Sequence, residues 1–573
     1  MQYIVSSSHP STHLVDIEFI INDHHSDTLD VHLPAWRPGR YELGNFAKNI
    51  QQWKAFDSKG NLLKSTKLSK DSWRIETPSI TEIHIRYNYY AYQLDAGACW
   101  VDDNQLYING VHCFLYVPER MGEPCDLQIK VPENWKIATG LKKMASHHLQ
   151  ADDYHVLVDS PFIASGNLQH RNFLALGTTF NIWIQGECRP DWEQIIKDFK
   201  AYTEEQITMM GEFPAKEYHY LIQVLPYRFY HGVEHLNSTV IAIGPGYNLM
   251  KGDTYEDFLG VNSHELFHSW NIKSIRPVEM FPYRYKEENY FRTGFVAEGI
   301  TTYYGDLFLV RAGVYSMTQY FNELNQRFQR HFDNFGRHTM PVAEASFDTW
   351  LDGYTPGIPN RKTSIYDEGS ICALMLDFTI RKFSNSKSSL DDLMRQLYTE
   401  FAKKGKGYSE ADFRQLVKQA AGIEGLDILD RYVYGSEDYE PRLQELLHLA
   451  GCYLSKTPSV LNSERMGFKT IQEGSLTKIT AVAPGSTAMH SGLQKDMEIL
   501  SVNGFRVEHN LNDWLNYFEK HTLKITVQFQ KRIEVIEFLP NEKEFYPKYK
   551  IEKQDNMNEA QQAFLESWVK QKK

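Results

Sequence analysis

The sequence predicts a multidomain α+β protein. Apolar and polar residues alternate over the first ~170 residues, with turn signals between the alternating segments. Apolar residues then recur at helical spacing, and short alternating segments with glycine-rich turns return near Leu461. The expected parts are a β-rich N-terminal domain, a mixed domain with a helical second half, another β-rich domain and a polar tail, at residues 1–175, 176–455, 456–545 and 546–573.

The N-terminal region is expected to be β-sandwich-like. Strict alternation in Val15–Ile20 and in Glu82–Tyr90 is typical of strands that are buried on one face. Turn signals such as Pro38-Gly39 and Asn109-Gly110 separate such segments. The domain would pack on its neighbour and help to form the wall of a cleft.

The middle region begins with a mixed pattern and becomes helical. A helix is expected at 190–212 and a strand at Tyr218–Leu225, followed by helices at 254–272 and 293–311. Long helical patterns dominate after residue 314. A cleft is expected between the α+β half and the helical half.

In the third region the sequence again predicts short strands. The predicted strands are Leu476–Val482, Glu498–Val502 and a closing pair at Leu523–Phe529 and Ile533–Leu539. The tail contains one predicted helix, Asn558–Lys570, in an otherwise polar and charged segment.

Composition narrows the classes of function. The chain carries 61 basic and 73 acidic residues, a net charge of -12 that argues against nucleic acid as a partner. It has no apolar stretch of about 18 residues, so no membrane helix is expected. The six cysteines form no CxxC pair and no signal peptide is visible, which predicts a cytoplasmic protein with free thiols. The oligomeric state is not readable.

The most informative motif is His264-Glu265-Leu266-Phe267-His268. Histidines four residues apart share one face of a helix and can bind one metal ion. Glu265 lies between them and can take a proton from the water that attacks a substrate. The motif therefore predicts a zinc-dependent hydrolase.

A catalytic zinc ion needs a third protein ligand and an open position. Glu298 is the best candidate because it is a lone acid in the apolar helical stretch Gly294–Ile300. Asp306, two turns further along the same helix, is the weaker candidate and could instead orient a ligand histidine. One zinc ion per chain is expected.

A wider set of segments identifies the family. They are His264-Glu265-Leu266-Phe267-His268-Ser269-Trp270-Asn271, Arg276-Pro277, Glu298-Gly299 and Leu33-Pro34-Ala35-Trp36-Arg37-Pro38-Gly39-Arg40-Tyr41. Together they resemble the glycyl aminopeptidase family, which combines a gluzincin (thermolysin-like) zinc peptidase domain with a PDZ domain. The resemblance covers nearly the whole chain and implies peptide substrates, with glycine or another small residue at the N-terminus.

The resemblance also implies residues that contact the substrate. In His231-Gly232-Val233-Glu234-His235, the Gly-x-x-Glu segment resembles the edge strand along the cleft, and Glu234 would bind the free α-amino group. Tyr366, in Ile365-Tyr366-Asp367-Glu368-Gly369, resembles the tyrosine that stabilises the oxyanion, although Glu368 stands where those enzymes carry lysine.

Residues 461–541 resemble a PDZ domain. Met466-Gly467-Phe468 resembles the carboxylate-binding loop, and Ile499-Leu500-Ser501-Val502-Asn503-Gly504 resembles a later part of the same signature. Such a domain would bind a peptide C-terminus by strand addition. A module that only packs on the catalytic domain is the alternative.

The leading hypothesis is a zinc aminopeptidase. The alternatives are a zinc endopeptidase with PDZ-assisted substrate binding and a non-catalytic peptide-binding scaffold. Cleavage of N-acetylated peptides would favour the endopeptidase, whereas absence of bound zinc would exclude both enzymes.

Overall fold

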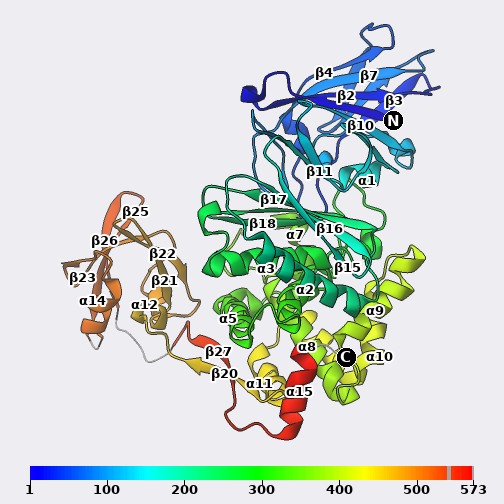
Figure 1. The fold of residues 1–573 in the computed structure, drawn as a ribbon. Coiled ribbons are helices and arrows are strands. Elements are labelled where there is room, and N and C mark those ends of the chain that lie inside the picture. Colours follow the sequence, from blue (N-terminus) through cyan, green and yellow to red (C-terminus); the bar gives the residue numbers. More distant parts are fainter. Residues whose placement is uncertain (356, 520, 539–543, 571–573) are drawn as a thin grey trace.

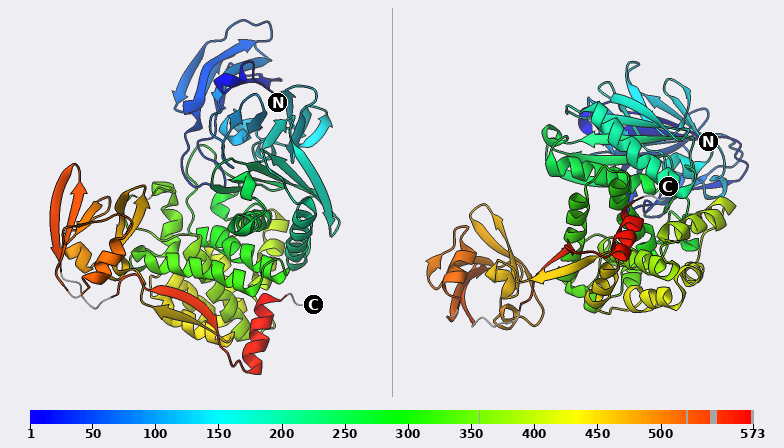
Figure 2. Two further views of the ribbon diagram at one scale, coloured as in Figure 1. Left: turned by 60° about the vertical axis from the view of Figure 1, so that its left-hand side comes forward. Right: turned by 60° about the horizontal axis from the view of Figure 1, so that its bottom comes forward.

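The computed structural model describes residues 1–573 except 356, 520, 539–543 and 571–573 (Figure 1). A β domain lies at the top of Figure 1, a mixed α/β region lies below it, and a helical region follows. A C-terminal β module stands to one side in all three ribbon views (Figures 1 and 2). The predicted multidomain α+β architecture is confirmed at this level.

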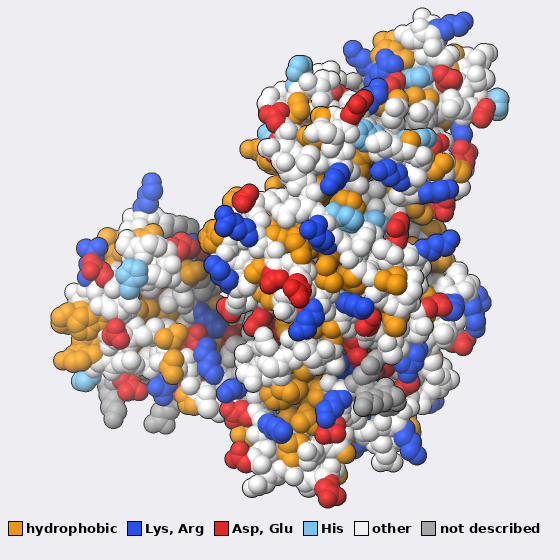
Figure 3. Space-filling view, viewed as in Figure 1, with side chains coloured by type: hydrophobic (Ala, Val, Ile, Leu, Met, Phe, Trp, Pro, Cys, Tyr) orange, Lys and Arg blue, Asp and Glu red, His pale blue; other side chains and the backbone are white. Residues whose placement is uncertain are grey.

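Three general properties of the described residues accompany this architecture. None of their helices is long and apolar enough to cross a membrane. Basic and acidic side chains are interspersed on the face shown in Figure 3. All six cysteines are free thiols.

The N-terminal domain is built on a seven-stranded sheet in the order β12-β13-β10-β1-β2-β7-β4. Along β2 every second residue is buried, so one face forms the core. The strands of this sheet are β1 (Gln2–Ser6), β2 (Leu14–Ile21), β4 (Ile50–Asp57), β7 (Ile83–Tyr90), β10 (Cys125–Lys130), β12 (Lys142–Ala145) and β13 (His148–Ala151).

Two smaller sheets complete the domain. One has the order β3-β6-β5 and the other β11-β14-β9-β8. Their elements, with one short helix, are β3 (Thr28–His32), β5 (Ser65–Ser69), β6 (Ser72–Glu76), β8 (Trp100–Val101), β9 (Gln105–Ile108), β11 (Lys136–Thr139), β14 (Phe162–Ser165) and α1 (Tyr154–Val158).

Residues 33–45, called here the cleft loop, leave the N-terminal domain after β3 and contact the central region. The Ala35 amide donates to the carbonyl of Tyr285 (2.7 Å). The Trp36 indole donates to the carbonyl of Arg284 (2.9 Å). These contacts, and the burial of Trp36, anchor the loop beside the central domain.

The central region contains a five-stranded sheet in the order β15-β16-β17-β19-β18. The sequence division assigned residues 169–175 to the N-terminal domain, but they form β15 of this sheet. Because β18 is an edge strand, one side of it stays open. The elements are β15 (Gln169–Ala175), β16 (Thr178–Gln185), β17 (Glu217–Val224), β18 (Phe229–Glu234), β19 (Ser238–Gly244), α2 (Trp192–Met210) and α3 (Gly252–Phe267).

The helical region surrounds two central segments, the π-helical η7 and the helix α8. They approach so closely that a Cβ on Gly299 would lie 2.4 Å from the Cα of Gly369. Glycine is therefore required at this crossing. The helices are η7 (Phe295–Ile300), α4 (Thr301–Arg311), α5 (Met317–Asp333), α6 (Val342–Phe347), α7 (Thr349–Asp352), α8 (Asp367–Ser384), α9 (Leu390–Glu400), α10 (Glu410–Ile428), η10 (Leu429–Val433) and α11 (Tyr439–Leu449).

The C-terminal β module has a hydrophobic core of its own. Its main sheet has the order β21-β22-β23-β25-β26, with β24 beside β23. Leu539, the last residue of the predicted closing pair, lies outside the described residues. The elements are α12 (Asn462–Arg465), β21 (Phe468–Glu473), β22 (Leu476–Val482), α13 (Thr487–His490), β23 (Glu498–Val502), β24 (Phe505–Arg506), α14 (Leu511–Tyr517), β25 (Leu523–Phe529) and β26 (Arg532–Phe538).

The segment 546–573, expected as a polar tail, instead returns to the helical region. Its strand β27 (Lys548–Lys553) pairs with β20 (Cys452–Thr457), which leads into the module. Its helix α15 (Glu559–Val569) buries Trp568 completely, and the Trp568 indole donates to the hydroxyl of Tyr303 (2.9 Å). Both ends of the module are therefore tied to the helical region.

Candidate active site

The two histidines of the motif lie at the C-terminal end of α3. The helix ends at Phe267, so the predicted extension to residue 272 was wrong, and His268 is the cap residue. The chain turns there, and the side-chain amide of Asn271 holds the turn by donating to the carbonyl of Val296 (2.7 Å) and to the hydroxyl of Thr301 (3.0 Å). This turn ties the motif to the helix that carries the third candidate ligand.

Glu298 is buried in η7, the π-helical segment that continues into α4. Irregular turns of this kind are frequent at functional sites. The hydroxyl of Tyr41, in the cleft loop, donates to Glu298 Oε1 (2.9 Å). One carboxylate oxygen is thereby held, and Oε2 faces the histidines.

His264, His268 and Glu298 form a zinc-site-like group. The Nε2 atoms of the histidines are 3.0 Å apart, and Glu298 Oε2 lies 3.4 Å from that of His268 and 3.9 Å from that of His264. Ligands about 2.0–2.2 Å from a tetrahedral zinc ion stand roughly 3.3–3.6 Å from one another. One of the three separations lies in this range, one is shorter and one is longer, so the three atoms converge as zinc ligands do without forming a regular tetrahedral face.

The orientation and the protonation of the His268 ring are set by its neighbours. Its Nδ1 lies 2.6 Å from the carbonyl of Asn271, which leaves Nε2 directed into the site. Burial lowers the pKa of His268, but the Glu298 carboxylate outweighs it and raises the pKa to about 10. Because a ligand histidine must be neutral, metal binding displaces a proton here.

Asp306, the weaker candidate ligand, is not part of this group. It lines the same cleft but forms an ion pair with Arg327. The partner explains how a carboxylate can lie buried on α4 without a metal ion.

Glu265 points from α3 toward the edge strand β18. Its side chain is buried, and Oε2 has no hydrogen-bond partner among the described residues. A Cβ on Gly232 would lie 2.3 Å from Glu265 Oε1, so a glycine in the strand makes room for the carboxylate. Burial raises the pKa of Glu265 well above its usual range, and the charges of Glu234 and Glu298 raise it further, although His268 opposes them.

Glu234 occupies the last position of β18 and is 4% exposed. Its Oε1 has no hydrogen-bond partner within the described chain, and its Oε2 would be 2.3 Å from a Cβ on Gly39 of the cleft loop. One ligating atom each from Glu234, Glu265 and His268 lie within 4.8 Å of one another. An unsatisfied carboxylate thus stands beside the metal group, in a cleft of about 610 Å³.

Asp159, from the segment after α1, fixes the chain just after Glu234. Its carboxylate lies 3.1 Å from Nδ1 of His235 and accepts the Leu236 amide (3.0 Å) and the Lys273 ammonium (2.6 Å). Lys273 lies in the turn after His268 and is fully enclosed by protein. One side-chain carboxylate of the N-terminal domain, that of Asp159, therefore holds both the edge strand and the metal-binding turn.

Tyr366 immediately precedes α8 and lines the cleft. Its hydroxyl lies 3.3 Å from that of Tyr354, which lines the same cleft. Tyr354, which was not predicted, therefore joins Tyr366 and Tyr41 in presenting a hydroxyl group to the cleft or its carboxylates.

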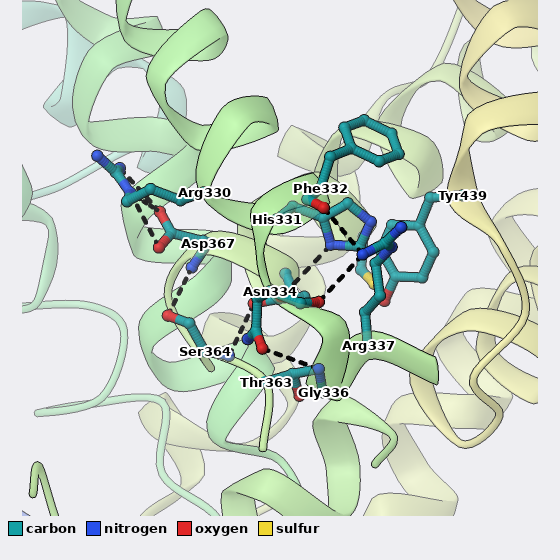
Figure 4. A network of polar contacts seen from close by, with 12 residues as sticks. Arg330, His331, Phe332, Asn334, Gly336, Arg337, Thr363, Ser364, Asp367 and Tyr439 are labelled. Carbon is teal, nitrogen blue, oxygen red and sulfur yellow. Dashed lines mark hydrogen bonds and ion pairs between the residues drawn. The ribbon is translucent and has the colours of Figure 1, made fainter. Parts of the chain in front are cut away.

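The start of α8 is held by a polar network (Figure 4). Arg330 forms a two-pronged ion pair with Asp367 (2.8–3.1 Å), and the Asp367 amide donates to the Ser364 hydroxyl (3.1 Å). Glu368, which replaces the lysine expected by resemblance, accepts the Ser364 amide (2.7 Å) and contacts His331 (3.3 Å). Glu368, in place of lysine, thus stabilises the loop before α8 through its contacts with Ser364 and His331.

The loop predicted to bind a peptide carboxylate has a different local role. Met466 and Phe468 are buried in the core of the β module, and Gly467 has a φ of +97°. The Met466 and Gly467 amides donate to the carbonyls of Asn462 and Glu464 (2.9 and 3.0 Å). Because these N–H groups are already used, the turn would have to open before it could hold a carboxylate.

The functional part of the cleft loop was not predicted from the sequence. Arg37, Gly39, Arg40 and Tyr41 all reach the cleft or its buried carboxylates. The only available signal was the unusual segment around Pro38-Gly39, which resembled the family but carried no assigned role.

We expect Tyr41→Phe to weaken zinc binding about 10–100-fold, because it removes the hydrogen bond that orients Glu298. The measurement is the zinc dissociation constant, by competition with a chromophoric chelator. Tyr3→Phe is the matched control, since it removes a buried tyrosine hydrogen bond (to Leu115, 2.8 Å) far from the metal group. Equal zinc affinity in the two variants would contradict the role of Tyr41.

Two family models match separate parts of the chain. A family model of the peptidase M61 N-terminal domain matches residues 2–166, and one of the M61 glycyl aminopeptidase matches residues 257–372. No curated protein sequence matches the chain.

Solved structures share the fold to different extents. An aminopeptidase N family protein from Idiomarina loihiensis is 26% identical, with a TM-score of 0.91 and 100% of both chains covered. An M1 zinc metallopeptidase from Deinococcus radiodurans, as a mutant bound to a Tyr-Ser-Ala substrate, is 13% identical with a TM-score of 0.46. That match covers 76% of this chain and 94% of the other.

Proposed function

The chain belongs to the M61 glycyl aminopeptidase family of zinc metallopeptidases, and on this premise we propose that it removes N-terminal residues from peptides with a free amino group. The observation that carries the proposal is the unsatisfied carboxylate of Glu234 beside the metal group. A buried carboxylate without a partner favours a cationic ligand. Glycine or another small residue is proposed as the first residue.

His264, His268 and Glu298 are proposed to hold one zinc ion per chain. The chemistry that zinc supplies when bound is a positive charge that polarises the scissile carbonyl and lowers the pKa of water. The protein's part is to keep two histidine nitrogens and one carboxylate oxygen convergent, which Asn271 and Tyr41 support through their hydrogen bonds.

Glu265 is proposed as the general base and acid. Its free Oε2 would take a proton from the attacking water and return it to the leaving amine. Tyr366 is proposed to donate a hydrogen bond to the carbonyl oxygen as negative charge develops there. Its position in the cleft wall supports that role, and so does the polar network that holds the start of α8.

Glu234 and Gly232 are proposed to set the position of the substrate. The open edge of β18 offers backbone groups to an extended peptide, which would lie along the strand. The ammonium group would stop at Glu234, so that the first peptide bond lies at the metal group. The substrate must then have a free N-terminus, because the ammonium group is what binds Glu234.

We expect Glu234→Gln to lower kcat/KM about 10–150-fold for a peptide with a free N-terminus, because a charged hydrogen bond to the amine is lost. Initial rates on a glycyl peptide amide and its N-acetyl form, with and without a chelator, measure this. Glu217→Gln, an exposed position at the start of β17, is the control. If the wild type cleaves both peptides equally, the endopeptidase alternative is favoured instead.

The C-terminal β module is proposed to be PDZ-like. The edge strand β21 and the helix α14 support this reading, and β21 offers an edge to which a peptide C-terminus would add. The segment Met466-Gly467-Phe468 would bind the terminal carboxylate of that peptide only after its backbone hydrogen bonds to Asn462 and Glu464 of α12 open.

A further inference from the structure

A second cavity lies beyond Glu234, on the side of the N-terminal domain. Its volume is about 380 Å³. Arg37 and Arg40 line this cavity and also line the cleft that holds the candidate metal ligands, so the two spaces adjoin at the cleft loop. The other charged side chains in its wall are Glu42, Lys48 and Asp95.

Arg37 is the unusual member of this wall. The residue is 4% exposed, and among the described residues its guanidinium makes no ion pair. Its one hydrogen bond there goes to the carbonyl of the adjacent Pro38 (3.2 Å). The guanidinium lies against Gly97, where a Cβ would be 2.4 Å from Nη2. Buried arginines are normally paired, because desolvation of an unpaired charge is costly.

Among the other charged side chains around this cavity, Arg40, Glu42 and Asp95 already have partners, and Lys48 is exposed to solvent. Arg40 forms an ion pair with Glu42 and lies over the ring of Tyr354 (5.3 Å). Asp95 accepts the Gly97 amide (2.7 Å) and the Gln93 side chain (2.5 Å). Arg37 is therefore the buried charge of this wall that remains available to a ligand.

Arg37 and Glu234 are complementary in this respect. Each is 4% exposed, each lines the cleft that holds the candidate metal ligands, and each has unused hydrogen-bonding capacity. A ligand that satisfied both would carry an ammonium group and a carboxylate close together. The N-terminal residue of a peptide has both groups when its side chain is acidic.

We propose that Arg37 binds the side-chain carboxylate of the first residue, so that peptides beginning with glutamate or aspartate are substrates. The proposal rests on the amine-binding role of Glu234. Glycine leaves the second cavity empty, whereas an acidic side chain would reach toward it. The fork of a guanidinium matches a carboxylate with two parallel hydrogen bonds.

The location argues for the first residue rather than for the C-terminal carboxylate of a short peptide. The second cavity is lined by none of the metal ligands and joins the cleft at Arg37 and Arg40. Gly39, between these arginines, is the residue that touches Glu234. A C-terminal carboxylate would lie past the metal group, where Asp257 and Glu323 are acidic and the arginines of the cleft wall, Arg327 and Arg330, are already paired with Asp306 and Asp367.

The test compares isosteric substrates on the zinc-loaded full chain. The peptides are tetrapeptide amides that begin with Glu or Gln and with Asp or Asn and are otherwise identical. We expect wild-type kcat/KM to be at least about tenfold higher for Glu than for Gln. In Arg37→Met we expect the Glu/Gln ratio to fall below one, because the acidic side chain then meets no cation. Arg37→Lys should keep a reduced preference.

The ratio within one variant is insensitive to loss of folded enzyme, and Arg120→Met is the control, because this arginine of the N-terminal domain is paired with Glu123 and lines neither cavity. We expect that control to keep the wild-type ratio within about twofold. A Glu/Gln ratio that is the same in wild type and Arg37→Met overturns the proposal. If wild type also cleaves N-acetylated peptides equally, the role of Glu234 has failed, whereas an intact requirement for the free amine isolates the failure to Arg37.

Discussion

Replacing Glu265 with glutamine is expected to lower kcat by about 10²–10⁴-fold while zinc stays bound. Glutamine keeps the size of the side chain, so it fits the space that Gly232 leaves beside the strand. It cannot take a proton from water at neutral pH, and the proton transfer is lost. The three metal ligands are untouched. The measurements are kcat on a glycyl peptide amide and zinc content of the purified variant.

A matched change on the same helix gives the comparison. Glu256 also lies on α3 and lines the cleft, but its carboxylate accepts from Gln319 (2.8 Å), away from the metal group. We expect Glu256→Gln to keep kcat within about twofold. Full activity of Glu265→Gln with zinc present would show that another group moves the proton.

The second large effect is on stability. We expect Asp159→Asn to lower the free energy of unfolding by about 3–5 kcal/mol, since it leaves the buried ammonium of Lys273 without its counter-charge. Thermal unfolding followed by calorimetry, on apo and zinc-loaded protein, measures the change. The KM for peptides should rise as well, because His235 and Leu236 lose the acceptor that fixes the end of β18.

The effect should depend on pH in a defined direction. Burial would raise the pKa of Asp159, but Lys273 and His235 outweigh it and hold the pKa well below its usual range. Asp159 therefore contributes stability that is complete above its unfolded pKa of about 3.9 and is lost as the pH falls toward the folded value. The gap between wild type and Asp159→Asn should shrink below about pH 4.

Asp30→Asn provides the control for this experiment. Asp30 forms a two-pronged pair with Arg74 at 2.7 Å, but the side chains are 30% and 49% exposed. We expect a loss of at most about 1 kcal/mol. An equal loss in the two variants would argue against a special role for the buried pair.

The metal group could be predicted from the sequence because its members are local. Two histidines at helical spacing and a lone acid in an apolar stretch each carry a signal within a few residues. The end of α3 could not be predicted in the same way. It depends on Asn271, whose partners Val296 and Thr301 lie on another helix.

The contribution of the N-terminal domain was not predictable. Tyr41 and Glu298 are 257 positions apart, and no periodicity links them. The same holds for Asp159 and Lys273, which are 114 positions apart. Such contacts follow from how domains dock, and a pattern within one element contains no information on that docking. The polar composition of 546–573 likewise concealed several buried residues, among them Ile551 on β27 and Trp568, which anchors α15.

The return of α15 has a consequence for the order in which the protein is made. Trp568 and the strand pair β20–β27 close the helical region only after the whole β module has been synthesised. The core around α4 therefore lacks its last segment until α15 has been made. A chain truncated inside the module would lack both β27 and the contact of Trp568 with Tyr303.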